Sequence, residues 1–239
     1  DAPQISELPY ARQIADWAGM EHNEIVIGQE EFMAFLPELV YFTDEPLADL
    51  ASVPLYYVSR LAGEKVKVVL SGEGSDEILG GYDFDRFMRD VDRSRTYQRL
   101  PGWLRTPGGL AFLHRFAGTQ FDRRYQINDA PLDLRRHAVP PHMTNYLTSK
   151  QKADLFVRVS GLRDSMDIVR ADIRRSHTAE PLHQMLYTYC QSWLVEDLLM
   201  KADRASMANS IELRTPFLDY RLVEWAARAP TFVKVGHDP

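Results

Sequence analysis

The chain has 239 residues, 45% of them hydrophobic and 26% charged, so it is long enough to bury a sizeable core as one large domain or two small ones. Its net charge of −6 argues against nucleic acid or an anionic membrane as the main partner. No apolar run approaches the ~20 residues that span a bilayer, and no signal peptide is visible. The one cysteine excludes an internal disulfide and fits a cytoplasmic location.

Hydrophobic periodicity predicts alternating helices and strands in the N-terminal part of the chain. Helical spacing occurs in residues 8–18, 30–41 and 50–61. Short apolar runs indicate strands at residues 24–27 and 66–70. This alternation implies a parallel, doubly wound sheet, whose ligands bind at the carboxyl ends of the strands.

Beyond Asp83 no strand stands out, and the pattern is that of amphipathic helices with Pro/Gly-rich breaks. Arg is dense in residues 83–136, but acidic residues are interspersed with it, which favours a solvated helical surface over an RNA-binding face. The predicted fold class is therefore α/β, with a partial doubly wound parallel sheet over residues 1–82 followed by a mostly α-helical region over residues 83–239.

The most informative stretch is residues 66–83, which spell VKVVLSGEGSDEILGGYD. An apolar run ends in a glycine-rich loop, and Ser75 opens a segment that predicts a helix. Gly72 and Gly74 can adopt φ > 0 and let a ligand approach the backbone, while a helix start offers N–H groups to an anion. The loop is neither a Walker A sequence nor a G-x-G-x-x-G fingerprint, and a plain turn is the structural alternative.

Three acidic residues crowd the same loop: Glu73, Asp76 and Glu77. Such a cluster is unfavourable for a bare anion site but suits Mg²⁺ that accompanies a polyphosphate. The loop therefore indicates nucleotide chemistry.

A second group of charged residues falls on one predicted helix face. Asp197, Lys201 and Arg204 are spaced i, i+4 and i+7. From spacing alone, a solvated, salt-bridged surface is the simpler interpretation. Farther on, Glu212 and Arg214 are expected to form a buried ion pair that orients the turn at residues 215–219, a structural role rather than direct catalysis.

The cysteine and the histidines give little indication of a catalytic or metal-binding role. Cys190 lies in an apolar context and is expected to be a small hydrophobe on a buried helix rather than a nucleophile. The seven His residues lack metal-ligand spacing, so we expect none of them to bind a metal.

Together these motifs resemble the synthetase domain of the glutamine-hydrolysing asparagine synthetase family, and the likeness runs along nearly the whole chain. The segments that carry it are Pro9-Tyr10-Ala11-Arg12, Thr43-Asp44-Glu45-Pro46, Ser71 to Glu77, Gly80-Gly81-Tyr82, Lys201 to Ala208 and Ile211 to Asp219. The resemblance implies an adenine nucleotide α-hydrolase-like sheet. It also implies a ligase that uses ATP and Mg²⁺ to adenylate the side-chain carboxylate of aspartate, which then reacts with ammonia from glutamine.

By this resemblance, Glu73 is the catalytic residue, placed beside the intermediate and the incoming ammonia, where a carboxylate can take up a proton. Asp76 is the expected Mg²⁺ ligand. The residues expected to bind the nucleotide are Ser71, Gly72, Glu73, Gly74, Ser75, Lys201 and Arg204.

Departures from the family pattern matter as well. The family's Ser-Gly-Gly-x-Asp-Ser loop should precede everything seen here, and a later catalytic lysine and the glutaminase domain are also missing. Residues 160–165, SGLRDS, mimic that loop, but they follow Ser71 in order and place Leu162 where a glycine is needed. We therefore expect an excised central fragment that is inactive alone.

Two alternatives stay open. One is a non-catalytic nucleotide-binding or assembly module. The other is a relative of the β-lactam synthetase or peptide cyclase type that acts on another carboxylate, although a Ser-Gly-Glu-Gly loop is associated with asparagine formation. The identity of the acceptor and the oligomeric state cannot be read from the sequence, and a homodimer of the complete protein is left open.

Overall fold

The computed structural model describes residues 7–45, 47, 49–82, 84, 88–89, 91–92, 99–105, 155 and 166–235. Contacts divide the chain into two compact units, and each unit is assembled from segments that are far apart in the sequence. Unit 1 comprises residues 1–71 and 197–214, and unit 2 comprises residues 72–196 and 215–239. The predicted division at residue 82 into an α/β part and a helical part stays a prediction.

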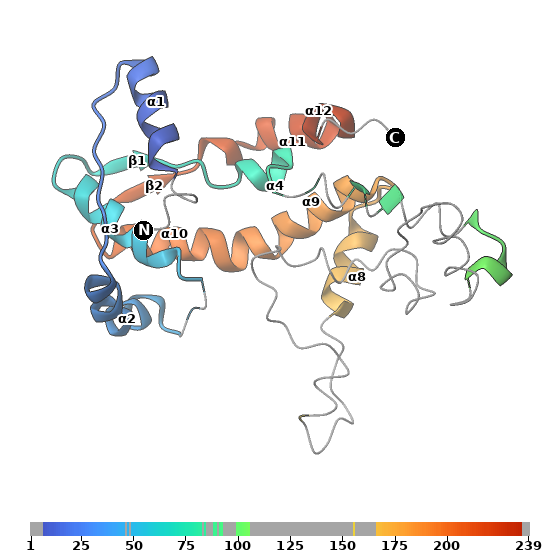
Figure 1. Cartoon of the computed structure of the whole chain (residues 1–239), viewed down its shortest axis with the longest axis horizontal. Helices are drawn as coiled ribbons and strands as arrows, with labels where there is room; N and C mark the ends of the chain where they lie inside the picture. Colours follow the sequence, from blue (N-terminus) through green and yellow to red (C-terminus); the bar gives the residue numbers. More distant parts are fainter. Residues whose placement is uncertain are drawn as a thin grey trace. The chain divides into compact units, whose positions relative to one another are not determined.

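Unit 1 combines helices with a small sheet (Figure 1). Its elements are α1 (Leu8–Ala18), α2 (Gln29–Thr43), α3 (Ser52–Gly63), β1 (Val68–Leu70), α10 (Met200–Met207) and β2 (Glu212–Arg214). The three N-terminal helices lie where the apolar periodicity predicted them, and β1 occupies the end of the predicted strand at residues 66–70.

The sheet of unit 1 has two parallel strands in the described chain, so the α/β class is confirmed while a doubly wound sheet stays a prediction. Val68 pairs with Glu212 and Leu70 with Arg214. At the carboxyl end of β1, the Ser71 N–H donates to the Arg214 carbonyl at 2.8 Å. The expectation of no strand beyond residue 83 was wrong, because a strand of three residues is too short to show alternation.

The predicted strand at residues 24–27 was also wrong, since this segment forms no ladder within the described chain. Ile25 and Ile27 nevertheless pack against the core of unit 1, whereas Val26 is 61% exposed. The alternation of apolar residues was therefore real, but it reports one-sided packing of an extended segment rather than strand pairing.

The core of unit 1 lies between α2 and α3. Its buried members are Phe35, Leu39, Val53 and Tyr57. The rings of Phe35 and Tyr56 stack with centroids 4.1 Å apart, which adds a directional contact to the apolar burial.

Asn209, which follows α10, links this helix to α3 through hydrogen bonds. Its Nδ2 group donates to the carbonyl oxygens of Tyr56, at 3.2 Å, and Ala205, at 3.0 Å. Gly63, the last residue of α3, has the Asn209 carbonyl and the Ile211 side chain close to its Cα. These contacts fix the helix that carries the second charged motif.

Unit 2 is helical in the described chain, as the sequence predicted (Figure 1). Its elements are α4 (Ser75–Leu79), η1 (Gly102–Arg105), α8 (Met166–Arg175), α9 (Pro181–Gln191), η5 (Pro216–Leu218), α11 (Tyr220–Arg228) and α12 (Thr231–Val235). A π-helical segment, η4 (Leu194–Leu199), spans the boundary between the two units. The SGLRDS segment at residues 160–165 lies outside the described residues.

The core of unit 2 forms around α9. Its buried members are Phe84, Met88, Val91, Leu182, Met185, Leu186 and Tyr189. On the same helix, burial raises the pKa of the Cys190 thiol to about 11, and the Glu77 charge adds to this. The protonated thiol agrees with the prediction of a small hydrophobe.

No helix in the described chain is both long and apolar enough to cross a bilayer.

Helix α3 offers a matched test of the unit 1 core, because Val53 is 0% exposed and Val58 is 52% exposed. We expect Val53→Ala to lower the free energy of unfolding by about 1–3 kcal/mol, since it removes buried methyl groups and leaves a cavity. Val58→Ala should change it by less than about 0.5 kcal/mol. Urea unfolding followed by circular dichroism measures both, and equal effects would contradict the described packing of α3.

Candidate functional site

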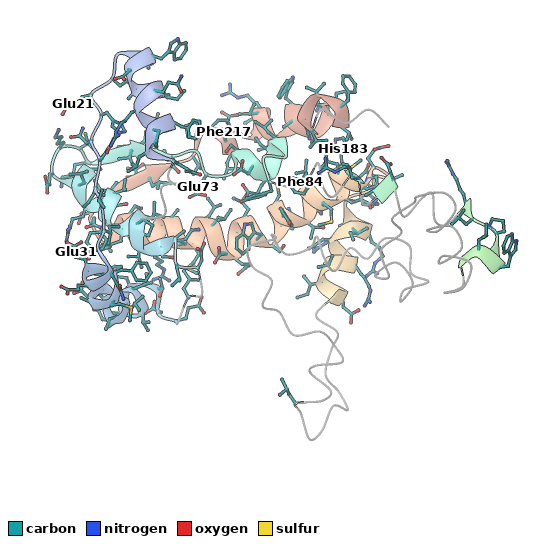
Figure 2. The ribbon with its side chains drawn as sticks, in the orientation of Figure 1. Glu21, Glu31, Glu73, Phe84, His183 and Phe217 are labelled. Carbon is teal, nitrogen blue, oxygen red and sulfur yellow. The ribbon has the colours of Figure 1, made fainter. Side chains whose placement is uncertain are left out.

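The predicted site residues divide between the two units. Unit 1 contains Ser71, Lys201 and Arg204, and unit 2 contains Gly72, Glu73, Gly74, Ser75 and Asp76. The loop follows β1 directly, and Glu73, labelled in Figure 2, lies on it at intermediate exposure. The predicted loop at the carboxyl end of a strand is therefore present.

The two loop glycines have different surroundings. Gly74 has φ +89°, and the Leu218 side chain fills the space that a Cβ would need. Around Gly72, by contrast, no described atom lies within 4 Å of a Cβ position. Gly74 is thus required by the packing of the loop, whereas the backbone at Gly72 is open to the close approach of a ligand.

The helix that follows the loop is shorter than the sequence suggested, because α4 has only 5 residues. Gly80 and Gly81 end it by donating their N–H groups to the Asp76 carbonyl at 2.9 and 3.2 Å. A Cβ on Gly81 would collide with the Asp76 carboxylate, so the side chain of Asp76 lies directly against this glycine. Asp76 is exposed, and a helix of this length contributes little dipole to an anion site.

Glu77 differs from its acidic neighbours because it is 1% exposed. The Tyr82 hydroxyl donates to its carboxylate, and burial together with this bond raises the pKa of Tyr82. Counting Glu77 with the metal-binding acidic cluster was therefore misleading. Its burial comes from the packing of α4 against α9, which the local sequence does not report.

Lys201 forms a buried ion pair in unit 1. Its ammonium bonds the Asp49 carboxylate, and the two side chains are 6% and 15% exposed. Burial alone would raise the pKa of Asp49, but hydrogen bonds from Lys201 and from the Ala51 N–H hold it below its ordinary value. Asp49 was not predicted from the sequence, because nothing there marks it as the partner of Lys201, which is distant along the chain.

Asp197 adds a second carboxylate to this pair. It lies against Asp49, and its Oδ2 atom is buried without a hydrogen bond in the described part of the structure. Burial and the neighbouring Asp49 charge raise the pKa of Asp197 to about 6. The site thus places one ammonium against two carboxylates, of which Asp197 takes up a proton first as the pH falls.

Arg204, one turn beyond Lys201, reaches a different acidic residue. Its Nη1 donates to Asp44 Oδ2 at 3.1 Å, and both side chains are exposed. Lys201 and Arg204 therefore join α10 to the segment that follows α2, which contains the Thr43-Asp44-Glu45 part of a family motif. Their assignment to nucleotide binding stays a prediction.

The pair of Glu212 and Arg214 exists but is not buried, which corrects the expectation. Arg214 Nε donates to Glu212 Oε1 at 2.8 Å, and the side chains are 61% and 59% exposed. Two residues of one strand that are two apart lie on the same face, and here that face is open. The following turn is fixed instead by Asp219, which caps α11 by accepting the Arg221 N–H at 2.9 Å.

No three His, Cys, Asp or Glu side chains gather into a potential metal cluster in the described ranges. The expectation that no histidine binds a metal stays a prediction.

Comparison with known proteins identifies the relatives of this sequence. A family model described as asparagine synthase matches residues 1–238. A putative glutamine-hydrolyzing asparagine synthetase of Mycobacterium tuberculosis is 34% identical, over 97% of this chain and 34% of the relative. Asparagine synthetase 1 of Bacillus subtilis is 32% identical, over 96% and 35%, and Amidase chyE of Penicillium rubens is 27% identical, over 98% and 36%. The chain thus spans about a third of the length of these relatives.

Gly74 and Gly72 form a second matched pair for mutation. Gly74→Ala should destabilise the fold by about 1–3 kcal/mol, because the left-handed backbone is strained for alanine and its Cβ meets Leu218. Gly72→Ala should have little effect on stability, since it has room in the described structure. Thermal unfolding of both variants checks this, and a Gly74→Ala protein as stable as Gly72→Ala would show that the loop is not packed as described.

The raised pKa of Asp197 predicts that the stability of the chain depends on pH. The pKa of Asp197 is raised to about 6, so the stability linked to its protonated form is complete below about pH 4 and is lost as the pH rises through 6. Asp197→Asn should raise the free energy of unfolding at pH 7.5 by about 1 kcal/mol, a value reduced because solvent screens this partly exposed group. It should also flatten the dependence between pH 4 and 7.

The control for this experiment is Asp203→Asn, which removes an exposed carboxylate from α10, the helix that follows η4. Urea unfolding at several pH values should leave its pH profile unchanged. If Asp197→Asn kept the slope of the wild type, the raised pKa of Asp197 would be disproved.

Proposed function

The chain belongs to the asparagine synthase family, and we propose from this that it carries part of the synthetase site of an ATP-dependent amidotransferase. In the proposed reaction, ATP adenylates the side-chain carboxylate of aspartate, and ammonia released from glutamine displaces AMP to give asparagine, with pyrophosphate as the other product. The glutamine-hydrolyzing step is assigned to a glutaminase domain of the complete protein.

The observation that best supports this proposal is the loop after β1. It begins at the carboxyl end of a parallel strand, the position at which open α/β sheets bind their ligands. Leu218 packs on Gly74, while Gly72 leaves the backbone accessible. This combination of a fixed loop with one open glycine suits a phosphate that contacts main-chain N–H groups.

Glu73 is the proposed catalytic residue. It stands between the two glycines on this loop and is neither deeply buried nor fully exposed. A carboxylate in that position can accept a proton from the ammonia nitrogen as the new C–N bond forms. Ser71, Gly72, Gly74 and Ser75 would surround the nucleotide.

Asp76 is the proposed ligand of Mg²⁺. Magnesium in nucleotide sites is held by one or two carboxylates together with substrate phosphates and water, so a single exposed carboxylate beside the loop fits it. When bound with ATP, the ion would neutralise charge that develops on the phosphates. The ion pairs of Lys201 and Arg204 within unit 1 give these residues a structural role, in addition to the nucleotide contact that is proposed for them.

The similarity to proteins named amidases supports a second candidate for the acceptor carboxylate. Amidase chyE and Amidase chry2 match almost the whole chain at 27% and 23% identity. These names refer to amide chemistry and not to asparagine, so we keep amide formation on a carboxylate other than that of aspartate, with the same adenylation step, as the second candidate function.

Glu73→Gln in the full-length protein tests the proposal. We expect amide formation from aspartate, ammonia and Mg·ATP to fall by about 10²- to 10⁴-fold, because a positioned proton acceptor is lost, while ATP binding is largely kept. Coupled detection of pyrophosphate and amide measures the rate, and calorimetry measures ATP binding.

Glu224→Gln is the matched control, since Glu224 is an exposed carboxylate on α11, outside the loop. A rate within about threefold of wild type for Glu73→Gln would remove this residue from the mechanism. Amide formation with another carboxylate, and none with aspartate, would favour the second candidate function.

A further inference from the structure

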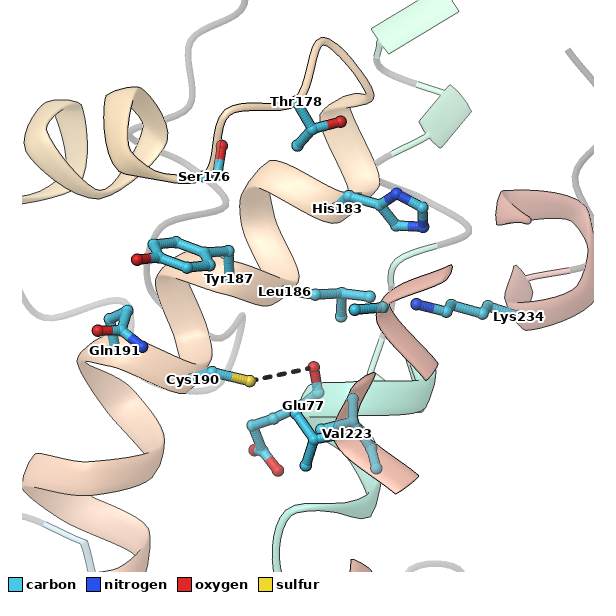
Figure 3. A pocket seen from close by; sticks show the side chains of 12 residues that line it. Glu77, Ser176, Thr178, His183, Leu186, Tyr187, Cys190, Gln191, Val223 and Lys234 are labelled. Atoms are coloured by element: carbon cyan, nitrogen blue, oxygen red, sulfur yellow. Dashed lines mark hydrogen bonds between the residues drawn. The ribbon is translucent and has the colours of Figure 1, made fainter. Parts of the chain in front are cut away.

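A separate cavity of about 360 Å³ lies within unit 2, lined by residues of α4, α9, α11 and α12 and of the segment that joins α8 to α9 (Figure 3). At roughly 30 Å³ for each water-sized group, it has room for a molecule of about ten non-hydrogen atoms. None of the predicted nucleotide or metal residues lines it, so it is distinct from the loop after β1.

The cavity has apolar walls with a cation at one side. Leu186, Val223 and Ala227 supply apolar surface, and Lys234 extends from α12 so that its ammonium end faces Leu186 (Figure 3). Pockets of this kind, apolar with a few placed polar groups, are typical of small-molecule sites.

Lys234 has no acidic partner among the residues that the structure describes. Burial lowers the pKa of its ammonium, and the Glu180 carboxylate acts on the neighbouring His183 rather than on Lys234. Glu77 also lines the cavity, and its backbone carbonyl accepts a hydrogen bond from Cys190 Sγ at 3.7 Å. Its carboxylate is engaged with Tyr82. A half-buried cation without a counter-charge favours the binding of an anion.

The protonation state of His183 determines how much negative charge the cavity can balance. Its Nε2 lies 3.1 Å from the Ala229 carbonyl oxygen, so that nitrogen carries the proton and donates. Burial and the Lys234 charge lower the pKa of the ring, which is therefore neutral at pH 7. The cavity thus offers one positive charge, which matches a monoanion better than a dianion such as hydrogen phosphate.

We propose that this cavity is a binding site for a small monocarboxylate with an apolar tail, in which Lys234 pairs with the carboxylate and the tail lies on Leu186, Val223 and Ala227. The proposal does not rest on the amidotransferase function. Aspartate is a poor occupant, because its second carboxylate and its ammonium would be set against the apolar walls.

The test uses 3-phenylpropionate as the probe, with its uncharged analogue 3-phenylpropanamide, inorganic phosphate and aspartate as comparisons, all without ATP. Ligand-observed NMR and calorimetry on the full-length protein give the affinities. We expect saturable binding of 3-phenylpropionate that is at least tenfold tighter than that of the amide, since the charge-assisted contact is lost. Phosphate and aspartate should not displace it.

Lys234→Met should weaken 3-phenylpropionate binding by about 10- to 100-fold, and Lys234→Arg should restore most of it. Ala227→Phe, at an exposed position of the lining, should block the tail without disturbing the core. Arg228→Met, which removes an exposed cation outside the lining, is the matched control and should bind as wild type does. Thermal unfolding confirms that each variant is folded.

Equal binding of the acid and the amide would overturn the proposal, as would unchanged binding in Lys234→Met or Ala227→Phe. Displacement of the probe by aspartate would also overturn it, because the cavity would then be part of a substrate site.

Discussion

The pairing of β1 with β2 is the constraint on which the arrangement of unit 1 depends. Two strands from distant parts of the sequence run parallel, and the last rung is the bond from the Ser71 N–H to the Arg214 carbonyl. Because the two strands run in the same direction, their carboxyl ends necessarily lie at the same end of the sheet, and the connection between them must be long. The glycine-rich loop and the turn at residues 215–219 therefore begin beside each other, although the sequence separates them widely.

The three buried charged groups in the described chain are handled in the same physical way. Lys201 is paired with Asp49, Asp172 is paired with Arg175, and the Glu77 carboxylate accepts a hydrogen bond from the Tyr82 hydroxyl, so each side chain has a partner. Removing a partner from such a group costs more than the interaction itself contributes, because the remaining group stays desolvated. Asp197, by contrast, is accommodated by taking up a proton near neutral pH.

Sequence patterns predicted the parts of this fold that depend on local order. The helices α1, α2 and α3 were found because their apolar residues recur over three or more turns. The loop after β1 was found because Gly, Ser and acidic residues are concentrated there. Residues 24–27 were assigned wrongly because alternation records which side chains are buried, whereas a strand also needs a neighbour to pair with.

The rest depended on contacts that a single sequence does not contain. β2 is three residues long and becomes a strand only through β1. Asp49 cannot be recognised as the partner of Lys201, and the exposed pair of Glu212 and Arg214 was expected inside because no pattern reports which face of a short strand is covered. Whether a single charged residue is buried depends on tertiary packing. Hydrophobic periodicity describes a whole segment and does not report the burial of one residue in it.

The contact between Gly74 and Leu218 has a mechanical consequence. Because Leu218 occupies the space beside Gly74, the loop and the turn cannot slide past each other without a steric clash. The turn leads directly into Asp219, which caps α11, and this helix carries Val223 and Ala227 on the wall of the cavity. A displacement of the loop at Gly74 would therefore require Leu218, and the start of α11 that follows it, to move as well.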